Sequence, residues 1–103
     1  MNLNQQQWAT QLAQDDNAVI LDVRTPEEWS HGIVPGAVMI DFYTGPDFLE
    51  GLQALDKDKN YYVYCKAGGR SAQACDIMNN LGIMKTFNLN GGFSQWQGDV
   101  TQP

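Results

Sequence analysis

Two short apolar runs limit the folds that this chain can adopt. The first extends from Ala18 to Val23 and the second from Tyr61 to Tyr64. Neither run is long enough for a core helix, and neither alternates polar with apolar residues as a half-exposed strand does. Nearly unbroken runs of this length are typical of strands that a parallel sheet buries on both faces. We therefore expect both runs to be strands of one sheet, with the second at its centre.

Segments with helical spacing separate these strands. In the helix expected over residues 46–55, the inward residues are Phe48, Leu49, Leu52 and Leu55. The complete set of expected elements is helices over 4–14, 26 to 30 or 31, 46–55, 71–81 and 93–97, and strands over 18–23, 38–40, 61–64 and 85–89. This alternation predicts an α/β fold, in which helices cover both faces of a mostly parallel central sheet.

The composition predicts one small domain with no affinity for polyanions. A chain of 103 residues buries about two thirds of its unfolded surface, so we expect one domain over residues 1–103 and a monomer. Twelve acidic and six basic residues give a net charge of −6, which argues against nucleic acid or an anionic membrane as partner. Without an apolar stretch of ~18 residues or a signal-peptide pattern, the expected location is cytoplasmic. Two cysteines and one histidine predict neither a disulfide framework nor a metal site.

The residues after the second strand form a candidate nucleophilic site. Cys65 stands at the carboxyl end of that strand, where open parallel sheets bind their ligands. Ala67, Gly68 and Gly69 have little or no side chain, so successive N–H groups can turn inward around an anion. A helix expected over Ser71–Leu81 would direct the positive end of its dipole at the sulfur. Because only a thiolate attacks, this environment favours a reactive Cys65.

Two cationic side chains belong to the same loop. Arg70 provides a planar guanidinium at the end of the loop, and Lys66 provides a mobile charge beside the cysteine. They are two of only six Lys and Arg residues in an acidic chain. We expect both to lower the pKa of the Cys65 thiol and to hold a small oxyanion next to it. The opposing interpretation is that Cys65 is a buried strand-end thiol without chemistry.

Four motifs resemble those of the single-domain rhodaneses, a family of sulfurtransferases. The active loop of that family reads Cys, four residues, then Arg and usually Ser, and residues 65–71 fit this pattern. The three other matching segments are Leu21–Trp29 with its Asp-x-Arg and acidic helix, Gly32–Ile40 with its Pro-Gly-Ala, and Asn90–Trp96 with its Gly-Gly-Phe-x-x-Trp. One position departs from the family, which often has a histidine directly after the glycine; here Ile33 follows Gly32 and the only histidine is His31.

The resemblance implies a three-layer rhodanese-like fold and a sulfurtransferase. Cys65 would take the sulfane sulfur from a small anionic donor such as thiosulfate and hold it as a persulfide. A thiol, cyanide or a protein would then accept that sulfur, and no metal or organic cofactor would be required. The residues implied to bind the donor are Lys66, Ala67, Gly68, Gly69, Arg70 and Ser71.

The sequence is also compatible with two other functions. Cysteine phosphatases also enclose an anion between Cys and Arg, but with five intervening residues, whereas Cys65 and Arg70 have four between them. The shorter loop makes a tighter ring, which suits a persulfide better than a tetrahedral phosphate. A non-catalytic module that binds a partner or relays sulfur to it would retain the same residues.

Three further residues are interpreted as structural. Asp22 and Arg24 stand together at a strand end, and we expect them to form an ion pair rather than to act in catalysis. Cys75 is expected to be a half-buried packing residue on the helix after the loop rather than a second reactive thiol.

Overall fold

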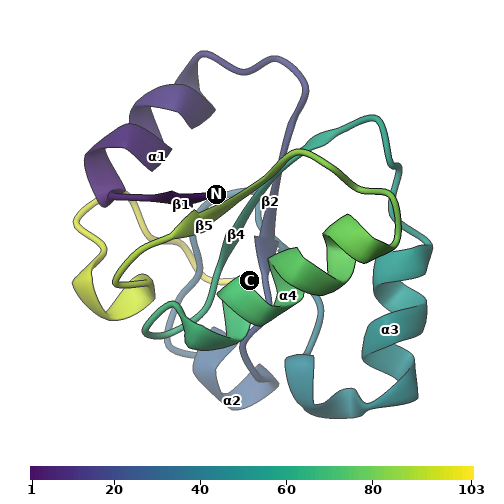
Figure 1. Ribbon diagram of the computed structural model, residues 1–103. Helices are drawn as coiled ribbons and strands as arrows, with labels where there is room; N and C mark the ends of the chain where they lie inside the picture. The colour runs from purple at the N-terminus through teal and green to yellow at the C-terminus, as the bar shows by residue number, and fades with distance from the viewer.

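The two apolar runs form neighbouring strands at the middle of one parallel sheet. The computed structural model describes residues 1–103, and its five strands lie in the order β1-β5-β4-β2-β3 with every neighbouring pair parallel (Figure 1). The strands are β1 (Asn2–Leu3), β2 (Ala18–Asp22), β3 (Val38–Met39), β4 (Asn60–Tyr64) and β5 (Thr86–Leu89). The position of β4 at the centre agrees with the sequence prediction. The edge strand β1 was not predicted, because two residues are too few to show a pattern.

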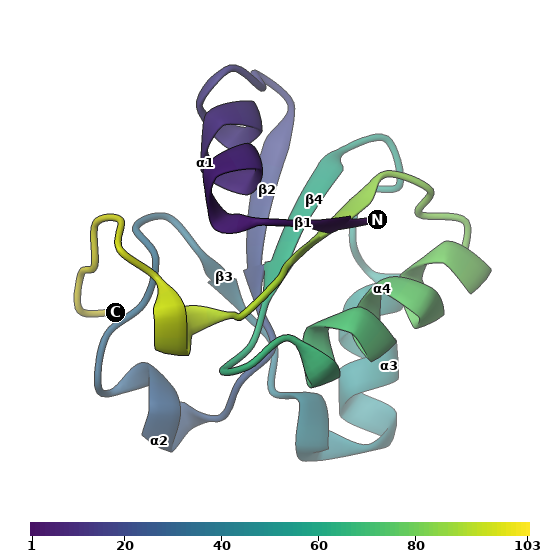
Figure 2. The same ribbon diagram turned by 60° about the vertical axis from the view of Figure 1, so that its left-hand side comes forward.

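Helices cover both faces of the sheet, which confirms the predicted α/β class (Figures 1 and 2). Helix α1 (Gln5–Ala13) lies on one face, and α3 (Pro46–Gln53) and α4 (Gly69–Asn80) lie on the other. The short helix α2 (Pro26–Trp29) follows β2 at the carboxyl end of the sheet, and two 3₁₀ turns occupy Phe42–Thr44 (η1) and Phe93–Gln95 (η2). None of the helices combines the length and apolar content that crossing a bilayer requires.

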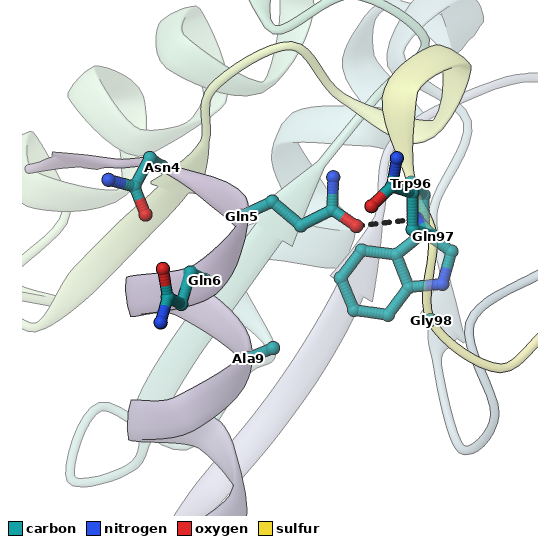
Figure 3. A pocket seen from close by; sticks show the side chains of 7 residues that line it. All are labelled: Asn4, Gln5, Gln6, Ala9, Trp96, Gln97 and Gly98. Atoms are coloured by element: carbon teal, nitrogen blue, oxygen red, sulfur yellow. Dashed lines mark hydrogen bonds between the residues drawn. The ribbon is translucent and has the colours of Figure 1, made fainter.

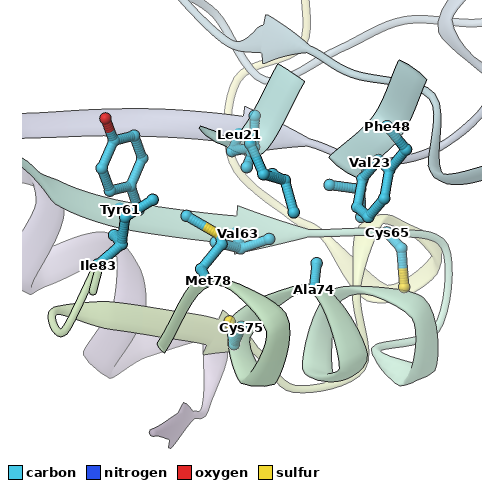
Figure 4. Close-up of a cluster of buried hydrophobic side chains, with 11 residues drawn as sticks. Leu21, Val23, Phe48, Tyr61, Val63, Cys65, Ala74, Cys75, Met78 and Ile83 are labelled. Carbon is cyan, nitrogen blue, oxygen red and sulfur yellow. The ribbon is translucent and has the colours of Figure 1, made fainter. Parts of the chain in front are cut away.

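Strand β4 supplies side chains to two separate cores. Tyr62 and Tyr64 pack with Trp8 of α1, whereas Tyr61 and Val63 pack against α3 and α4. This division follows from the alternation of side chains along a strand, which has a period of two residues. The same alternation continues one residue past β4 and directs Cys65 toward α4 (Figure 4). The strand therefore determines which face of the sheet receives the sulfur.

One of the four residues predicted to point inward from the third helix does not do so. Phe48 and Leu52 are buried and Leu55 is partly buried, but Leu49 is 42% exposed. Phe48 and Leu52 are four residues apart and share one face, whereas Leu49 lies about 100° further around the helix. Because α3 buries only a narrow stripe, the prediction that Leu49 points inward was wrong.

Candidate active site

Cys65 lies at the carboxyl end of the central strand, directly in front of the first turn of α4. The residue is 1% exposed, and its side chain points toward that turn (Figure 4). Its Sγ accepts a hydrogen bond from the Gly68 N–H at 3.1 Å and one from the Ser71 hydroxyl at 3.3 Å. The predicted loop therefore surrounds the sulfur with donors.

Helix α4 begins at Gly69, two residues earlier than the predicted start at Ser71. The reason is Gly68, which caps the helix with φ of +106°, a conformation that residues with a Cβ rarely adopt. The tight turn at Gly68 brings Gly69 and Arg70 into the helix and places Ser71 within its first turn. The Gly68 N–H at the start of this helix donates to Cys65 Sγ.

Hydrogen bonding lowers the pKa of the Cys65 thiol despite its burial. Burial is the largest influence and by itself raises that pKa, because it disfavours the thiolate. The Ser71 hydroxyl and the N–H groups of Ser71, Gly68 and Ala67 act in the opposite direction and together outweigh it. The Ser71 hydroxyl is also 3.2 Å from the Gly68 carbonyl oxygen, and its single proton favours the acceptor that carries charge. The thiolate is thus the form that this site stabilises.

Replacing Ser71 by alanine is expected to raise the pKa of Cys65. The variant removes the strongest donor that favours the thiolate while burial continues to oppose it. The rate of alkylation by iodoacetamide, measured against pH, should therefore reach its plateau at higher pH than in the wild type. Ser94→Ala is a suitable control, since its hydroxyl contacts the Gly91 carbonyl and not the sulfur. An unchanged profile in Ser71→Ala would mean that the hydroxyl does not influence the thiol.

Arg70 lies at the end of the loop, and its guanidinium is paired with a carboxylate that the sequence did not indicate. Its Nη1 and Nη2 donate to the two carboxylate oxygens of Glu28 at 2.8 and 3.0 Å. Its guanidinium carbon also lies 5.5 Å from the centre of the exposed Tyr43 ring. Arg70 therefore joins α4 to α2 and η1 across the mouth of the loop, with most of its charge compensated.

Glu28 is the residue that sequence reasoning missed. It occupies the third position of α2, where its carboxylate also accepts bonds from the Thr25 N–H and hydroxyl. The pattern Thr-x-x-Glu is a capping-box signal, which explains why Glu28 was interpreted only as part of the acidic start of a helix. Its hydrogen bonds from Arg70, opposed by burial, lower the pKa of Glu28 to about 2. No sequence signal connects Glu28 to a residue 42 positions later.

Lys66 lies on the opposite side of the strand end from the Cys65 side chain. It is exposed and lines a hollow of about 210 Å³ together with His31, Phe93 and Ser94, whose other walls are Arg24 and Glu28. Ala67 and Gly69 are exposed and complete the loop. The structure thus brings Ala67, Gly68 and Ser71 to the sulfur, and no hydrogen bond joins Lys66, Gly69 or Arg70 to it.

The loop rests on the second glycine of the Gly-Gly-Phe motif. Gly92 has φ of +60° and ψ of −161°, and a Cβ there would lie 2.5 Å from the Lys66 carbonyl oxygen and 2.6 Å from that of Cys65. The next residue, Phe93, donates its N–H to the Cys65 carbonyl at 2.8 Å. Only glycine allows η2 to approach the backbone of the nucleophile this closely.

Gly92→Ala is expected to destabilise the protein by about 2–5 kcal/mol, from backbone strain added to overpacking against the two carbonyls. Gly36→Ala is the matched control, because Gly36 also has positive φ, +84°, but a Cβ there meets nothing within 4 Å. The control should lose about 1–2 kcal/mol from conformation alone. Urea unfolding compares the two, and equal losses would contradict the close packing inferred at Gly92.

The expected pairing of Asp22 and Arg24 is confirmed. Both residues are buried, and Arg24 Nη2 lies 2.7 Å from Asp22 Oδ2. The guanidinium also donates to the Gly32 carbonyl at 2.8 Å and stacks 4.2 Å from the centre of the Phe93 ring. This pair fastens β2 to the Gly32 turn and to η2, beneath the active loop. Cys75 is more deeply buried than expected, at 4% exposure, and burial raises the pKa of its thiol.

The largest hollow on the surface, about 590 Å³, lies away from the loop. It is bounded by the start of α1 and the 96–98 segment (Figure 3). The residues that line it are Asn4, Gln5, Gln6, Ala9, Trp96, Gln97 and Gly98. None of these side chains titrates or acts as a nucleophile, so the chemistry of the protein is expected at Cys65.

Comparisons with known proteins agree with this geometry. The model of the rhodanese-like domain family matches residues 5–99. The YtwF protein of Bacillus subtilis (strain 168) is 37% identical over 86 residues, which cover 84% of this chain and 80% of YtwF. The thiosulfate sulfurtransferase GlpE of Stutzerimonas stutzeri (strain A1501) is 34% identical over 80 residues, covering 78% of this chain and 71% of GlpE.

A solved structure extends the agreement to the fold. The crystal structure of a rhodanese-like domain protein from Staphylococcus aureus superposes with a TM-score of 0.83 at 30% identity, covering 99% of this chain and 97% of the other. The parallel sheet with helices on both faces is therefore the rhodanese-like fold that the motifs had implied. A family match along nearly the whole chain, relatives above 30% identity and a shared architecture mean that this protein belongs to the rhodanese-like domain family.

Proposed function

We propose that this protein is a sulfurtransferase that carries sulfur as a persulfide on Cys65. The thiolate attacks the outer sulfur of a donor such as thiosulfate, a new S–S bond forms at Cys65, and the donor's S–S bond breaks. Sulfite leaves with the bonding electron pair, so thiolate and thiosulfate dianion become persulfide anion and sulfite dianion. The observation that carries this proposal is the buried sulfur at the N-terminus of α4, which accepts hydrogen bonds from the Gly68 N–H and the Ser71 hydroxyl.

The burial of Cys65 supports transfer of a single atom. At 1% exposure, the residue leaves little room for a bulky group beside the sulfur, whereas a terminal sulfane sulfur is small. The Gly68 N–H and the Ser71 hydroxyl favour the thiolate, and they are also placed to donate hydrogen bonds to the negatively charged persulfide that replaces it. The intermediate would then be stabilised by the same groups that activate the nucleophile.

The second half of the reaction returns Cys65 to the thiolate. A nucleophile attacks the outer persulfide sulfur, the S–S bond breaks, and its electron pair returns to Sγ. We propose a thiol, cyanide or a cysteine of another protein as acceptor, with the protein acting as a cytoplasmic monomer. Every step uses groups of the chain and of the two substrates.

Steady-state turnover tests the proposal. The purified protein is incubated with thiosulfate and cyanide, and thiocyanate is measured against an otherwise identical mixture without protein. Protein-dependent thiocyanate is the expected result. The same preparation is given an aryl phosphate ester, which should not be hydrolysed. Hydrolysis of the ester without thiocyanate formation would contradict the proposal and indicate a phosphatase instead.

A further inference from the structure

The Lys and Arg residues divide between the two ends of the sheet. Lys57, Lys59 and Lys85 line a hollow that also includes the start of β4. Arg24, Lys66 and Arg70 lie at the carboxyl end, where the active loop is. Arg24 is neutralised by Asp22 and Arg70 by Glu28, which leaves Lys66 as the only one of the three without an ion-pair partner. The single unpaired charge of Lys66 is a small positive charge for a site that is proposed to bind an oxyanion, in a chain whose net charge is −6.

We propose that Glu28 determines the charge selectivity of the site, by neutralising Arg70 so that singly charged sulfane donors are favoured over doubly charged ones. This inference rests on the sulfurtransferase function proposed above. The carboxylate engages both terminal nitrogens of Arg70, at 2.8 and 3.0 Å, and the two side chains are 26% and 17% exposed. A partly buried bidentate pair is less screened by solvent than a surface pair and is geometrically fixed.

Both members of the pair are charged at neutral pH. With a pKa of about 2, Glu28 is ionised throughout the neutral range, and the guanidinium is always charged. The two bonds use one N–H of each terminal nitrogen, which leaves the Nε–H and the outer N–H groups of Arg70 without a hydrogen-bond partner. Arg70 can therefore still donate hydrogen bonds to a donor molecule, while its net attraction for a dianion is reduced.

The test compares two donors that differ by one charge. Thiosulfate is a dianion, and methanethiosulfonate carries the same sulfane sulfur with a methyl group in place of one oxyanion. The ratio of their kcat/KM values is measured in wild type and in Glu28→Gln. The variant should raise kcat/KM for thiosulfate relative to methanethiosulfonate by roughly five- to tenfold, the order of effect expected from one unit charge near a partly screened site. A change in thiol reactivity affects both donors and cancels in the ratio.

Glu27→Gln is the matched control. Glu27 is the neighbouring residue of α2, is exposed and forms no ion pair, so this variant changes the net charge equally. It should shift the ratio by less than about twofold, because exposed charges are screened by solvent and salt. An equal shift in the two variants, no shift in Glu28→Gln, or a shift toward methanethiosulfonate would overturn the inference.

Two readouts keep the inference independent of folding and of turnover. Glutamine can also serve at the third position of a capping box, so Glu28→Gln should fold, and its melting curve verifies this. If it unfolds, the wild type still decides: added salt should leave kcat/KM for thiosulfate unchanged or raise it, because the overall charge repels a dianion. A clear fall with salt would mean that the site attracts thiosulfate through a net positive charge, which would overturn the inference.

If the wild type transfers sulfur from neither donor, the proposed function is wrong. The effect of Glu28 on the charge selectivity of the site can then be tested by anion binding. Sulfate is a dianion and methanesulfonate is a monoanion, so these two unreactive anions differ by one charge, as the two sulfur donors do. Each is tested for protection of Cys65 from iodoacetamide. Glu28→Gln should strengthen protection by sulfate more than protection by methanesulfonate. Equal changes for the two anions would contradict the role assigned to Glu28.

Discussion

Cys65→Ser is expected to abolish sulfur transfer while leaving the protein folded. Serine has nearly the shape of cysteine, and its hydroxyl can still accept the bond from the Gly68 N–H. Its oxygen, however, is protonated at neutral pH and forms no bond equivalent to a persulfide, so turnover of thiosulfate with cyanide should fall by at least about 10³-fold. Thiocyanate formation measures the loss, and circular dichroism with a melting curve establishes that the fold is retained.

Cys75→Ala provides the control for the second thiol. Cys75 is buried against β4 on the body of α4, where alanine preserves a small apolar side chain. Transfer should remain within about twofold of wild type, since buried thiols in apolar surroundings are inert. Turnover that persists in Cys65→Ser would contradict the assignment of the transferred sulfur to Cys65. So would a loss of turnover in Cys75→Ala while the fold stays intact.

Asp22→Ala is expected to destabilise the protein by about 3–5 kcal/mol, because it leaves the Arg24 guanidinium buried without its counter-charge. The carboxylate of Asp22 accepts bonds from Arg24 Nε, Arg24 Nη2 and the Arg24 N–H, at 2.7 to 3.1 Å. The Arg24 side chain is 4% exposed, so water cannot replace these bonds in the folded state. Urea unfolding measures the free-energy change.

An exposed carboxylate shows what the loss of charge alone does to stability. Glu50 lies on α3, is exposed and forms no ion pair, and Glu50→Ala should change stability by no more than about 0.5 kcal/mol. If Asp22→Ala costs no more than this control, the buried pair does not hold β2 to the loop region. Because Arg24 stacks on Phe93, which bonds the Cys65 carbonyl, a loosened pair should also slow transfer.

The position of Cys65 could be predicted because it depends on strand periodicity and sheet direction. An apolar run of strand length places Tyr61 to Tyr64 inside a parallel sheet, and the residue after it then lies at the ligand-binding edge. Small residues followed by a helix predict N–H groups around the sulfur. These inferences need only local sequence, and the structure agrees with them.

The features that were not predicted depend on contacts between distant segments. The partner of Arg70 is Glu28, and neither residue type nor spacing indicates which acidic side chain of twelve it meets. The start of α4 depends on a positive φ at Gly68, although glycine alone does not specify that value. Leu49 and Phe48 are equally apolar, and only the position of α3 decides which of them is buried.

The state of Cys65 after exposure to a donor can be read directly from the mass of the intact protein. The wild type is incubated with thiosulfate in the absence of an acceptor, desalted, and digested to locate the modification. The expected result is a mass increase of one sulfur atom on the peptide that contains Cys65, which added cyanide removes. An unchanged mass with a free Cys65 thiol, or a sulfur atom located on Cys75, would contradict the persulfide mechanism.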